Sequence, residues 1–193
     1  MKGAIILGTI GFLLYFIYDV NSVLWRNTLF QKFFAAGSIC VAVSAAWSLW
    51  NGLKKGMAAP GVRAACAAGS LVFLIFLVYT LFFALPFEET YVKESGVRLA
   101  YTEGIYALCR HPGVLWFAGL FFCLWGMTGE FSRGTYFVGM ILWNYLYIVF
   151  QDLWTFPRTF TNYGEYKQTT PFLMPKPDSI RACFRRKPKV DGI

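Results

Sequence analysis

Five long apolar runs constrain this chain more than any other feature of its sequence. They extend over residues 4–18, 33–50, 64–85, 112–127 and 136–150. A helix needs roughly 20 largely apolar residues to cross the hydrocarbon core of a bilayer, and irregular backbone is not tolerated against lipid. The runs therefore predict an all-α, multi-pass integral membrane protein with about five transmembrane helices.

The composition agrees with a bilayer environment. Charged residues make up 15% of the chain, whereas soluble domains carry about 25%. Tryptophan and tyrosine gather near the ends of the apolar runs, as in the aromatic belts of membrane proteins. These residues are Trp25, Trp47, Trp50, Tyr79, Trp116 and Trp154. The first run is followed by "YDVNSVLW" and not by a small-residue cleavage site, so we expect it to be retained as a span.

Several function classes are disfavoured by the same residues. The 5 cysteines include no C-x-x-C pair, and His111 is the only histidine, so we expect no metal site. The net charge of +8 would suit nucleic acid in a soluble protein. Here the basic residues concentrate at the C-terminus, which favours anionic lipid headgroups as the partner, with no nucleic acid. A solvated tail that only enforces topology is the alternative.

The chain divides into three parts. Residues 1–86 hold three N-terminal spans, residues 87–175 hold a polar loop, the last two spans and the start of the tail, and residues 176–193 form a basic tail. With the tail in the cytosol, thirteen of the 18 Lys and Arg residues lie on the cytosolic side and five lie outside. The outer loop "NGLKKGMAAPGVR" opposes this orientation, which the overall count nevertheless favours.

The last two spans are joined only by "TGEFSRG", so they must run antiparallel. Arg110, His111 and Pro112 at the start of one should therefore lie beside Gln151 and Asp152 at the end of the other. Proline suits the first turn of a helix, and the preceding residues meet unpaired N–H groups that attract anions. Such a pocket could hold a zwitterion. Alternatively, the polar side chains only extend to the lipid headgroups.

Two stretches resemble the isoprenylcysteine carboxyl methyltransferases and related phospholipid methyltransferases, which are integral membrane enzymes. "LAYTEGIYALCRHPGV" follows their pattern L-V-T-x-G-x-Y-x-x-x-R-H-P-x-Y, and "QDLWTFPRTFTNYGEYKQTTPFLMP" follows a second block with F-G-x-x-Y-x-x-Y and a later proline. The matching residues are Leu99, Thr102, Gly104, Tyr106, Arg110, His111, Pro112, Tyr163, Tyr166, Lys167, Pro171 and Pro175. The resemblance covers residues 97–175.

The resemblance implies S-adenosylmethionine as cofactor and a lipid-like or small apolar acceptor that approaches from the bilayer. The cofactor pocket would lie at the cytosolic face, between the last two spans, the preceding loop and the tail. The cofactor-binding positions would be Arg98, Leu99, Ala100, Tyr101, Tyr106, Arg110, His111, Pro112, Gly113, Val114 and Gln151. Asp152 would serve as the base for a thiol or amine acceptor, and Arg158 or Arg110 as the cation for a carboxylate acceptor. Tyr147 would contact the substrate.

Departures from the family pattern leave other functions open. Val114 replaces a tyrosine, Phe160 replaces a glycine, and Gln151 and Asp152 replace paired glutamates. Gln151 can still accept a hydrogen bond but carries no charge. An inactive or binding-only relative is one alternative. A reductase that uses NADPH is another, since some sterol reductases share a similar C-terminal region.

Overall fold

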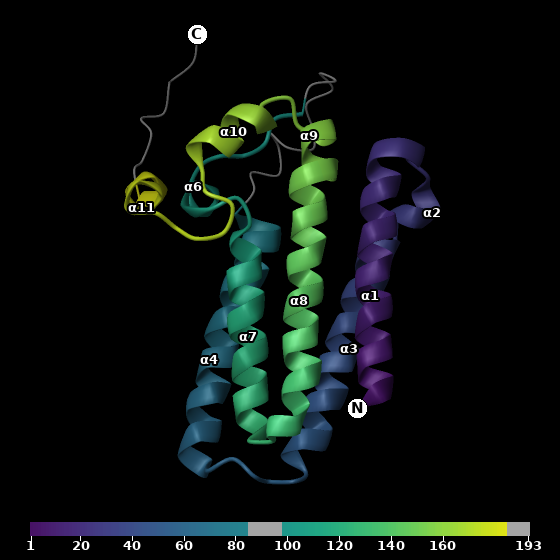
Figure 1. Ribbon diagram of the computed structural model, residues 1–193, viewed down its shortest axis with the longest axis vertical. Helices are drawn as coiled ribbons and strands as arrows, with labels where there is room; N and C mark the ends of the chain where they lie inside the picture. The colour runs from purple at the N-terminus through teal and green to yellow at the C-terminus, as the bar shows by residue number, and fades with distance from the viewer. Residues whose placement is uncertain (85–97, 185–193) are drawn as a thin grey trace.

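The structure is a computed structural model that describes residues 1–84 and 98–184, and in these residues every secondary-structure element is helical. The all-α prediction is thus confirmed for the described residues. The long helices are α1 (Lys2–Val20), α3 (Phe33–Leu53), α4 (Pro60–Val78), α7 (Pro112–Thr128) and α8 (Gly134–Phe150). They lie side by side in one bundle (Figure 1).

Short helices gather at one end of the bundle, which we call the capped end (Figure 1). They are α6 (Ile105–Leu108), α9 (Phe156–Thr159), α10 (Tyr163–Thr169) and α11 (Pro177–Phe184). Three π-helical turns prolong long helices at this end: η1 (Asn21–Trp25), η2 (Tyr79–Phe83) and η4 (Gln151–Thr155). At the opposite end, which we call the hairpin end, the 3-10 turn η3 (Phe131–Arg133) links α7 to α8. A further short helix, α2 (Thr28–Gln31), follows α1 and precedes α3 in the sequence.

Three helical segments are long and apolar enough to cross a membrane: Lys2–Trp25, Thr28–Leu53 and Pro60–Phe83. Helix α7 is apolar but has 17 residues, which extend about 26 Å at 1.5 Å per residue, against a hydrocarbon core of about 30 Å. Helix α8 also has 17 residues. In the described residues, helix length and composition therefore establish three candidate spans. The predicted fourth span is shorter, and the predicted fifth, α8 with its extension η4, does not meet the same criteria.

The helix boundaries differ from the predicted ones for local reasons. Helix α4 begins at Pro60, earlier than predicted, because proline fits the first helical turn. The first helix extends through η1, and Asn21 holds the turn that follows it. The Asn21 side chain donates to the carbonyl of Asn27 at 3.0 Å and accepts from its N–H at 2.8 Å. Residues 85 and 86, the predicted end of the third span, lie outside the described residues.

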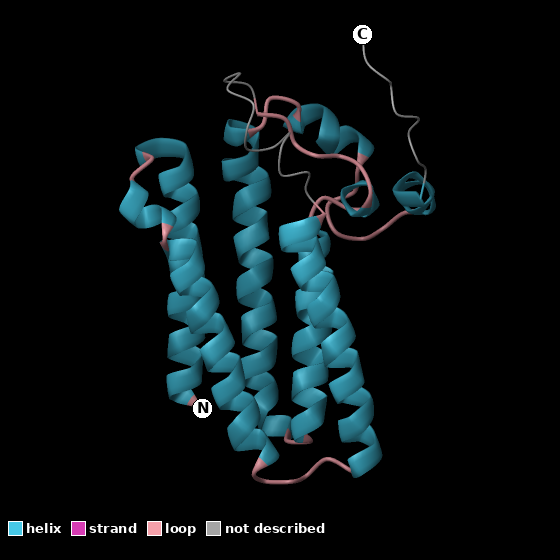
Figure 2. Ribbon diagram, turned by 180° about the vertical axis from the view of Figure 1, so that it is seen from behind, coloured by secondary structure: helices cyan, strands magenta, loops and turns pink. Residues whose placement is uncertain are grey.

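Helices α7 and α8 form the predicted antiparallel hairpin, and this prediction is confirmed (Figure 1). Helix α1 packs along α3, α4 packs along α7, and α8 lies between the two pairs in contact with α1 and α7. Seen from behind, the loop between α3 and α4 lies at the same end as the α7–α8 link (Figure 2). The capped end therefore receives the C-terminal ends of α1, α4 and α8 and the N-terminal end of α7.

The core of the bundle is largely aromatic. Phe12 of α1 packs edge-on against Phe117 of α7 with ring centroids 6.1 Å apart. Phe117 stacks on Phe121 at 4.1 Å, and Phe121 meets Phe137 of α8 at 6.1 Å. Such offset and edge-to-face pairs add to the free energy gained by apolar burial. These rings join α1, α7 and α8, the helices that meet at the capped end.

A cluster of three ionised side chains closes the hairpin end. Lys55, in the loop after α3, pairs with Glu130 at 2.6 Å, and Arg133 pairs with the other oxygen of the same carboxylate. Hydrogen bonds from Lys55 and Ser132, together with Arg133, lower the pKa of Glu130 to about 2. The cluster ties the α3–α4 loop to the α7–α8 link.

Close contact between α1 and α3 gives a first prediction. A Cβ atom on Gly37 would lie 2.7 Å from the carbonyl oxygen of Gly11. Gly37→Ala must therefore push the two backbones apart, and overpacking of this kind costs about 1–3 kcal/mol. We expect a lower midpoint of thermal unfolding in detergent. Gly139→Ala is the matched control, since a Cβ on Gly139 meets open space; equal stability of the two variants would contradict the close α1–α3 packing.

Candidate functional site

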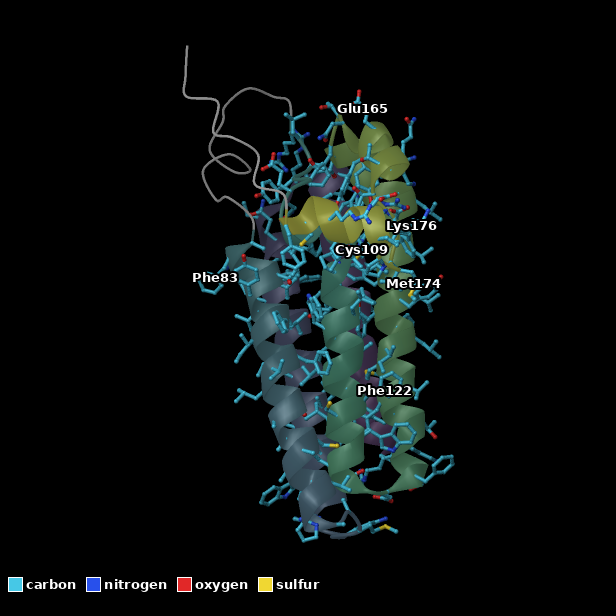
Figure 3. All side chains as sticks on the ribbon, turned by 90° about the vertical axis from the view of Figure 1, so that its left-hand side faces the viewer. Phe83, Cys109, Phe122, Glu165, Met174 and Lys176 are labelled. Carbon is cyan, nitrogen blue, oxygen red and sulfur yellow. The ribbon has the colours of Figure 1, made fainter. Side chains whose placement is uncertain are left out.

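The two sequence blocks that resemble methyltransferase motifs meet at the capped end. The first block leads into α7 and the second follows α8, so the antiparallel hairpin brings them to one place (Figure 1). Cys109, directly before Arg110, lies near the level of α11, together with Met174 and Lys176 (Figure 3). Glu165 of α10 lies further out, at the tip of the capped end (Figure 3).

Four side chains from the two blocks converge on the carboxylate of a fifth residue, Asp152. Arg110 donates from Nε to Asp152 Oδ1 at 2.8 Å and from Nη2 to Oδ2 at 3.2 Å. Tyr163 donates to Oδ1 at 2.7 Å, and Lys167 Nζ lies 2.9 Å from Oδ2. His111 Nε2 lies 3.3 Å from Oδ1. We call these five residues the Asp152 cluster. The prediction that Arg110 and His111 lie beside Asp152 is confirmed.

The Asp152 cluster is buried, and burial sets its charges. The side chains of Arg110 and Asp152 are 8% and 6% exposed. Burial alone would raise the pKa of Asp152, but hydrogen bonds from His111, Arg110, Tyr163 and Lys167 lower that pKa far below its usual value. Burial lowers the pKa of His111, and Asp152 offsets this only in part. At neutral pH the cluster therefore holds one anion, two cations and a neutral imidazole.

Main-chain carbonyls of the tail complete the coordination of Arg110. Its Nη1 donates to the carbonyl of Thr170 at 2.8 Å, and its backbone N–H donates to the carbonyl of Pro171 at 2.9 Å. The guanidinium lies over the ring of Phe172 at 5.5 Å. His111 is fixed in turn by Phe156, on which its ring stacks at 5.6 Å. Since both side chains are held on several sides, the cluster is rigid.

The segment before α6 pairs with the loop before α10. The Ala100 N–H donates to Asn162 Oδ1 at 2.7 Å, and Asn162 Nδ2 donates to the Ala100 carbonyl at 3.1 Å. The Thr161 N–H donates to the carbonyl of Arg98 at 3.0 Å. Leu99, between these contacts, is exposed. Main-chain pairing therefore fixes this part of the first block against the second.

Tyr106 links the first block to α4 as well as to α10. Its hydroxyl donates to the carbonyl of Thr80 in η2 at 2.8 Å, and its own carbonyl accepts from the Tyr166 hydroxyl at 2.6 Å. The ring of Tyr101 meets that of Tyr106 at 6.1 Å. Gly104 allows the turn before α6, because its φ of 56° and ψ of −130° suit only glycine. The motif positions thus have structural reasons for their identities.

Gln151 and Tyr147 lie apart from the Asp152 cluster. Gln151 Nε2 donates to the Tyr147 hydroxyl at 2.9 Å. Both residues contact Asp19 of α1, which also accepts from Thr155 at 3.4 Å. We call Asp19, Tyr147, Gln151 and Thr155 the Asp19 cluster. Gln151 and Asp152 are adjacent in the sequence, but Gln151 belongs to the Asp19 cluster and Asp152 to the Asp152 cluster.

The remaining predicted site residues have other surroundings. Arg158 is exposed, donates to the carbonyl of Trp154 at 3.0 Å and lies over its ring at 5.1 Å, outside the Asp152 cluster. Pro112 is the first residue of α7 and is buried, as is Val114. A Cβ on Gly113 would lie 3.8 Å from Leu77 of α4. Residues 112–114 therefore contribute to helix packing.

Sequence reasoning assigned no role to several residues that hold the site. Tyr163 and Lys167 were recognised as motif positions, but their contacts with Asp152 were not expected. Asn162 and Thr80 stood out in no pattern. Asp19 carried a signal that was overlooked: an ionisable residue at the edge of an apolar run marks a functional or structural polar site.

An open pocket of about 230 Å³ lies against the Asp152 cluster and is lined by Arg110, Val149, Asp152, Leu153 and Phe172. It offers both charge signs beside apolar walls, a combination that suits a small polar or zwitterionic group. Pockets for drug-sized ligands measure about 300–1,000 Å³. This pocket therefore accommodates a group the size of an amino acid, and not a whole nucleoside-bearing cofactor.

Comparisons of the chain with protein-family models, with curated proteins and with solved structures found no match.

The geometry of the Asp152 cluster gives a second prediction. Arg110→Lys keeps the positive charge but cannot reproduce the two-pronged contact with Asp152 together with the bond to Thr170. We expect the free energy of unfolding to fall by about 1.5–3 kcal/mol. Arg181→Lys, on an exposed α11 side chain, should leave it unchanged. Equal unfolding curves for both variants in the same detergent would show that Arg110 does not stabilise the fold.

Proposed function

We propose that this chain is an integral membrane methyltransferase that transfers a methyl group from S-adenosylmethionine to a lipid-like or small apolar acceptor. The supporting observation is the Asp152 cluster, which joins the two sequence blocks that resemble the family. His111 and Arg110 come from the first block, and Asp152, Tyr163 and Lys167 come from the second. If the sequence resemblance were due to chance, there would be no reason for the two blocks to meet in one cluster.

The proposal includes five membrane spans with the capped end in the cytosol. The inner loops and the tail hold most of the Lys and Arg residues. The outer loop after α3 opposed this orientation in the sequence, but Lys55 and Arg133 share the carboxylate of Glu130. That pairing offsets part of the positive charge on the outer side.

The tail fits an anionic lipid surface. Helix α11 exposes Ile180 and Phe184 beside the exposed Arg181, and such a mixture suits the membrane interface. The basic residues of the tail beyond Phe184 lie outside the described residues. Basic side chains near an anionic surface add about 1 kcal/mol each to binding.

The donor set fits one end of the proposed cofactor. Arg110 offers a cation to the carboxylate of the amino-acid end, and Asp152 offers an anion to its ammonium; both line the pocket. The pocket volume of about 230 Å³ matches that end alone. When bound, S-adenosylmethionine supplies an activated methyl group on a sulfonium. The adenosyl part would extend beyond this volume.

The chain's own contribution is positioning and exclusion of water. The network around Asp152 fixes the charges that would orient a ligand, and Val149, Leu153 and Phe172 provide apolar walls. Because hydrogen bonds lower the pKa of Asp152 far below neutral, this carboxylate is a weak proton acceptor. An acceptor that arrives already ionised, such as a carboxylate, needs no base. Arg110, which lines the pocket, is then better placed than the exposed Arg158 to pair with such a carboxylate acceptor.

A binding-only relative is the second candidate. It is favoured by the orientation of Gln151, which donates to Tyr147 and is not among the residues that line the pocket. The double variant Gln151→Glu with Val114→Tyr restores the family residues. Methyl transfer that appears only in this variant would support lost catalysis, and continued absence of transfer with intact cofactor binding would argue against a simple loss.

The third prediction tests the cofactor directly. Purified full-length protein in detergent should bind S-adenosylmethionine by titration calorimetry. His111→Asn removes the stacked imidazole next to Asp152, and we expect it to weaken binding at least tenfold, which corresponds to about 1.4 kcal/mol. Glu165→Gln, at the exposed tip of the capped end (Figure 3), is the matched control and should bind as wild type does.

The same preparation distinguishes the alternatives. Incubation with methyl-labelled cofactor and a membrane lipid extract, followed by identification of the labelled product, should reveal the acceptor. Absence of binding to folded protein contradicts the methyltransferase proposal. Tight binding of NADPH in its place would support the reductase alternative.

A further inference from the structure

Asp19 is a buried acid at the capped end that the proposed reaction does not use. It is 3% exposed and lies in the last turn of α1, where α1 packs against α8 and η4. The rings of Tyr15 and Phe16 each pack against Tyr147 with centroids 5.4 Å apart. This aromatic layer lies one turn before Asp19 on α1 and helps to exclude water from the junction.

The groups that contact the Asp19 carboxyl are neutral. Thr155 donates to Oδ2 at 3.4 Å, and the side chains of Gln151 and Tyr147 lie beside the same carboxyl. Gln151 also donates to the Tyr147 hydroxyl at 2.9 Å. The side chain of the neighbouring Asn21 is fully engaged with the backbone of Asn27. The junction is therefore a closed network of one acid and three neutral polar groups.

Among the described residues, no cation balances this acid. In residues 1–84 and 98–184, no Lys, Arg or His forms an ion pair with Asp19. Arg110 and Lys167, from the capped end, are both committed to Asp152. Of the other titratable groups on α1, α8 and η4, Tyr15 and Tyr18 of α1 lie near Tyr147 at the junction, and Asp152 of η4 points to Arg110 and Lys167.

A carboxylate that is buried without a counter-ion pays a large desolvation penalty, and such a group takes up a proton. The chain offers the resulting acid a place in the network, because the amide oxygen of Gln151 and the hydroxyl of Tyr147 can accept its hydrogen bond. Asp152 illustrates the opposite case. It is equally buried but meets two cations and a phenol.

We propose that Asp19 is a proton-binding site, at which a neutral carboxylic acid joins α1 to α8 and η4 in the folded protein. Rising pH releases the proton to water and leaves an uncompensated anion, so the junction between α1 and α8 weakens. The proposal holds whether or not the chain is a methyltransferase, and its test needs no cofactor.

The fourth prediction follows the proton by infrared spectroscopy of the full-length protein in lipid. The C=O stretch of a protonated carboxylic acid should be present at pH 5, absent from Asp19→Asn and lost from wild type as the pH is raised through neutral. The exposed Asp178 of α11 provides the control, since Asp178→Asn should leave the band unchanged. If Asp19→Asn fails to fold, Thr155→Val should shift the band of wild type without abolishing it.

Thermal unfolding gives a second readout. Because the folded state binds the proton more tightly than the unfolded state, wild type should lose stability as the pH rises through the titration of Asp19. The expected slope is about 2–5 °C in midpoint for each pH unit. Asp19→Asn should show no such slope on the alkaline side. An acid band that is missing from wild type at pH 5 would overturn the proposal, as would a midpoint that depends on sodium at fixed pH in wild type alone.

Discussion

The capped end depends on one buried carboxylate. Asp152 receives hydrogen bonds from Arg110 and Tyr163 and an ion pair from Lys167, so a single side chain joins the segment before α7 to the segment after α8. A buried anion is costly unless each of its oxygens is paired. The network meets that condition, and the same condition commits Arg110 and Lys167 to it. Any ligand of the neighbouring pocket has to interact with side chains whose charges are already paired with one another.

The turn η4 separates two polar environments that lie back to back. Asp152 points toward cations, whereas Gln151 and Thr155 point toward Asp19 and neutral groups. Wide π-helical turns are uncommon and frequently occur at functional sites. Here they also end α1 and α4, and each carries a buried polar residue, Asn21 in η1 and Thr80 in η2. The capped end is thus held to the helices by polar groups as well as by apolar packing.

Much of the fold follows from the sequence, because helix length, a short link and a proline at a helix start leave few choices. The hairpin that brings His111 beside Asp152 was predictable from "TGEFSRG" alone. The contacts that each site residue makes were not predictable from the sequence. A family pattern shows which residues recur, but it does not show the direction in which each side chain points. Gln151 was grouped with Asp152 by adjacency, yet the helical turn directs it to α1. Arg158 was chosen for its charge, but stacking on Trp154 draws it away.

In the proposed five-span arrangement, helix α7 has a consequence for the lipid around the protein. Its 17 residues are shorter than a typical hydrocarbon core is thick, and a short span is accommodated by local thinning of the bilayer or by movement of flanking polar groups into the headgroup layer. The Asp152 cluster sits directly at its start. On this flank the membrane surface would dip toward the bundle, so lipid headgroups would meet the buried charges at a depth where elsewhere there are only acyl chains.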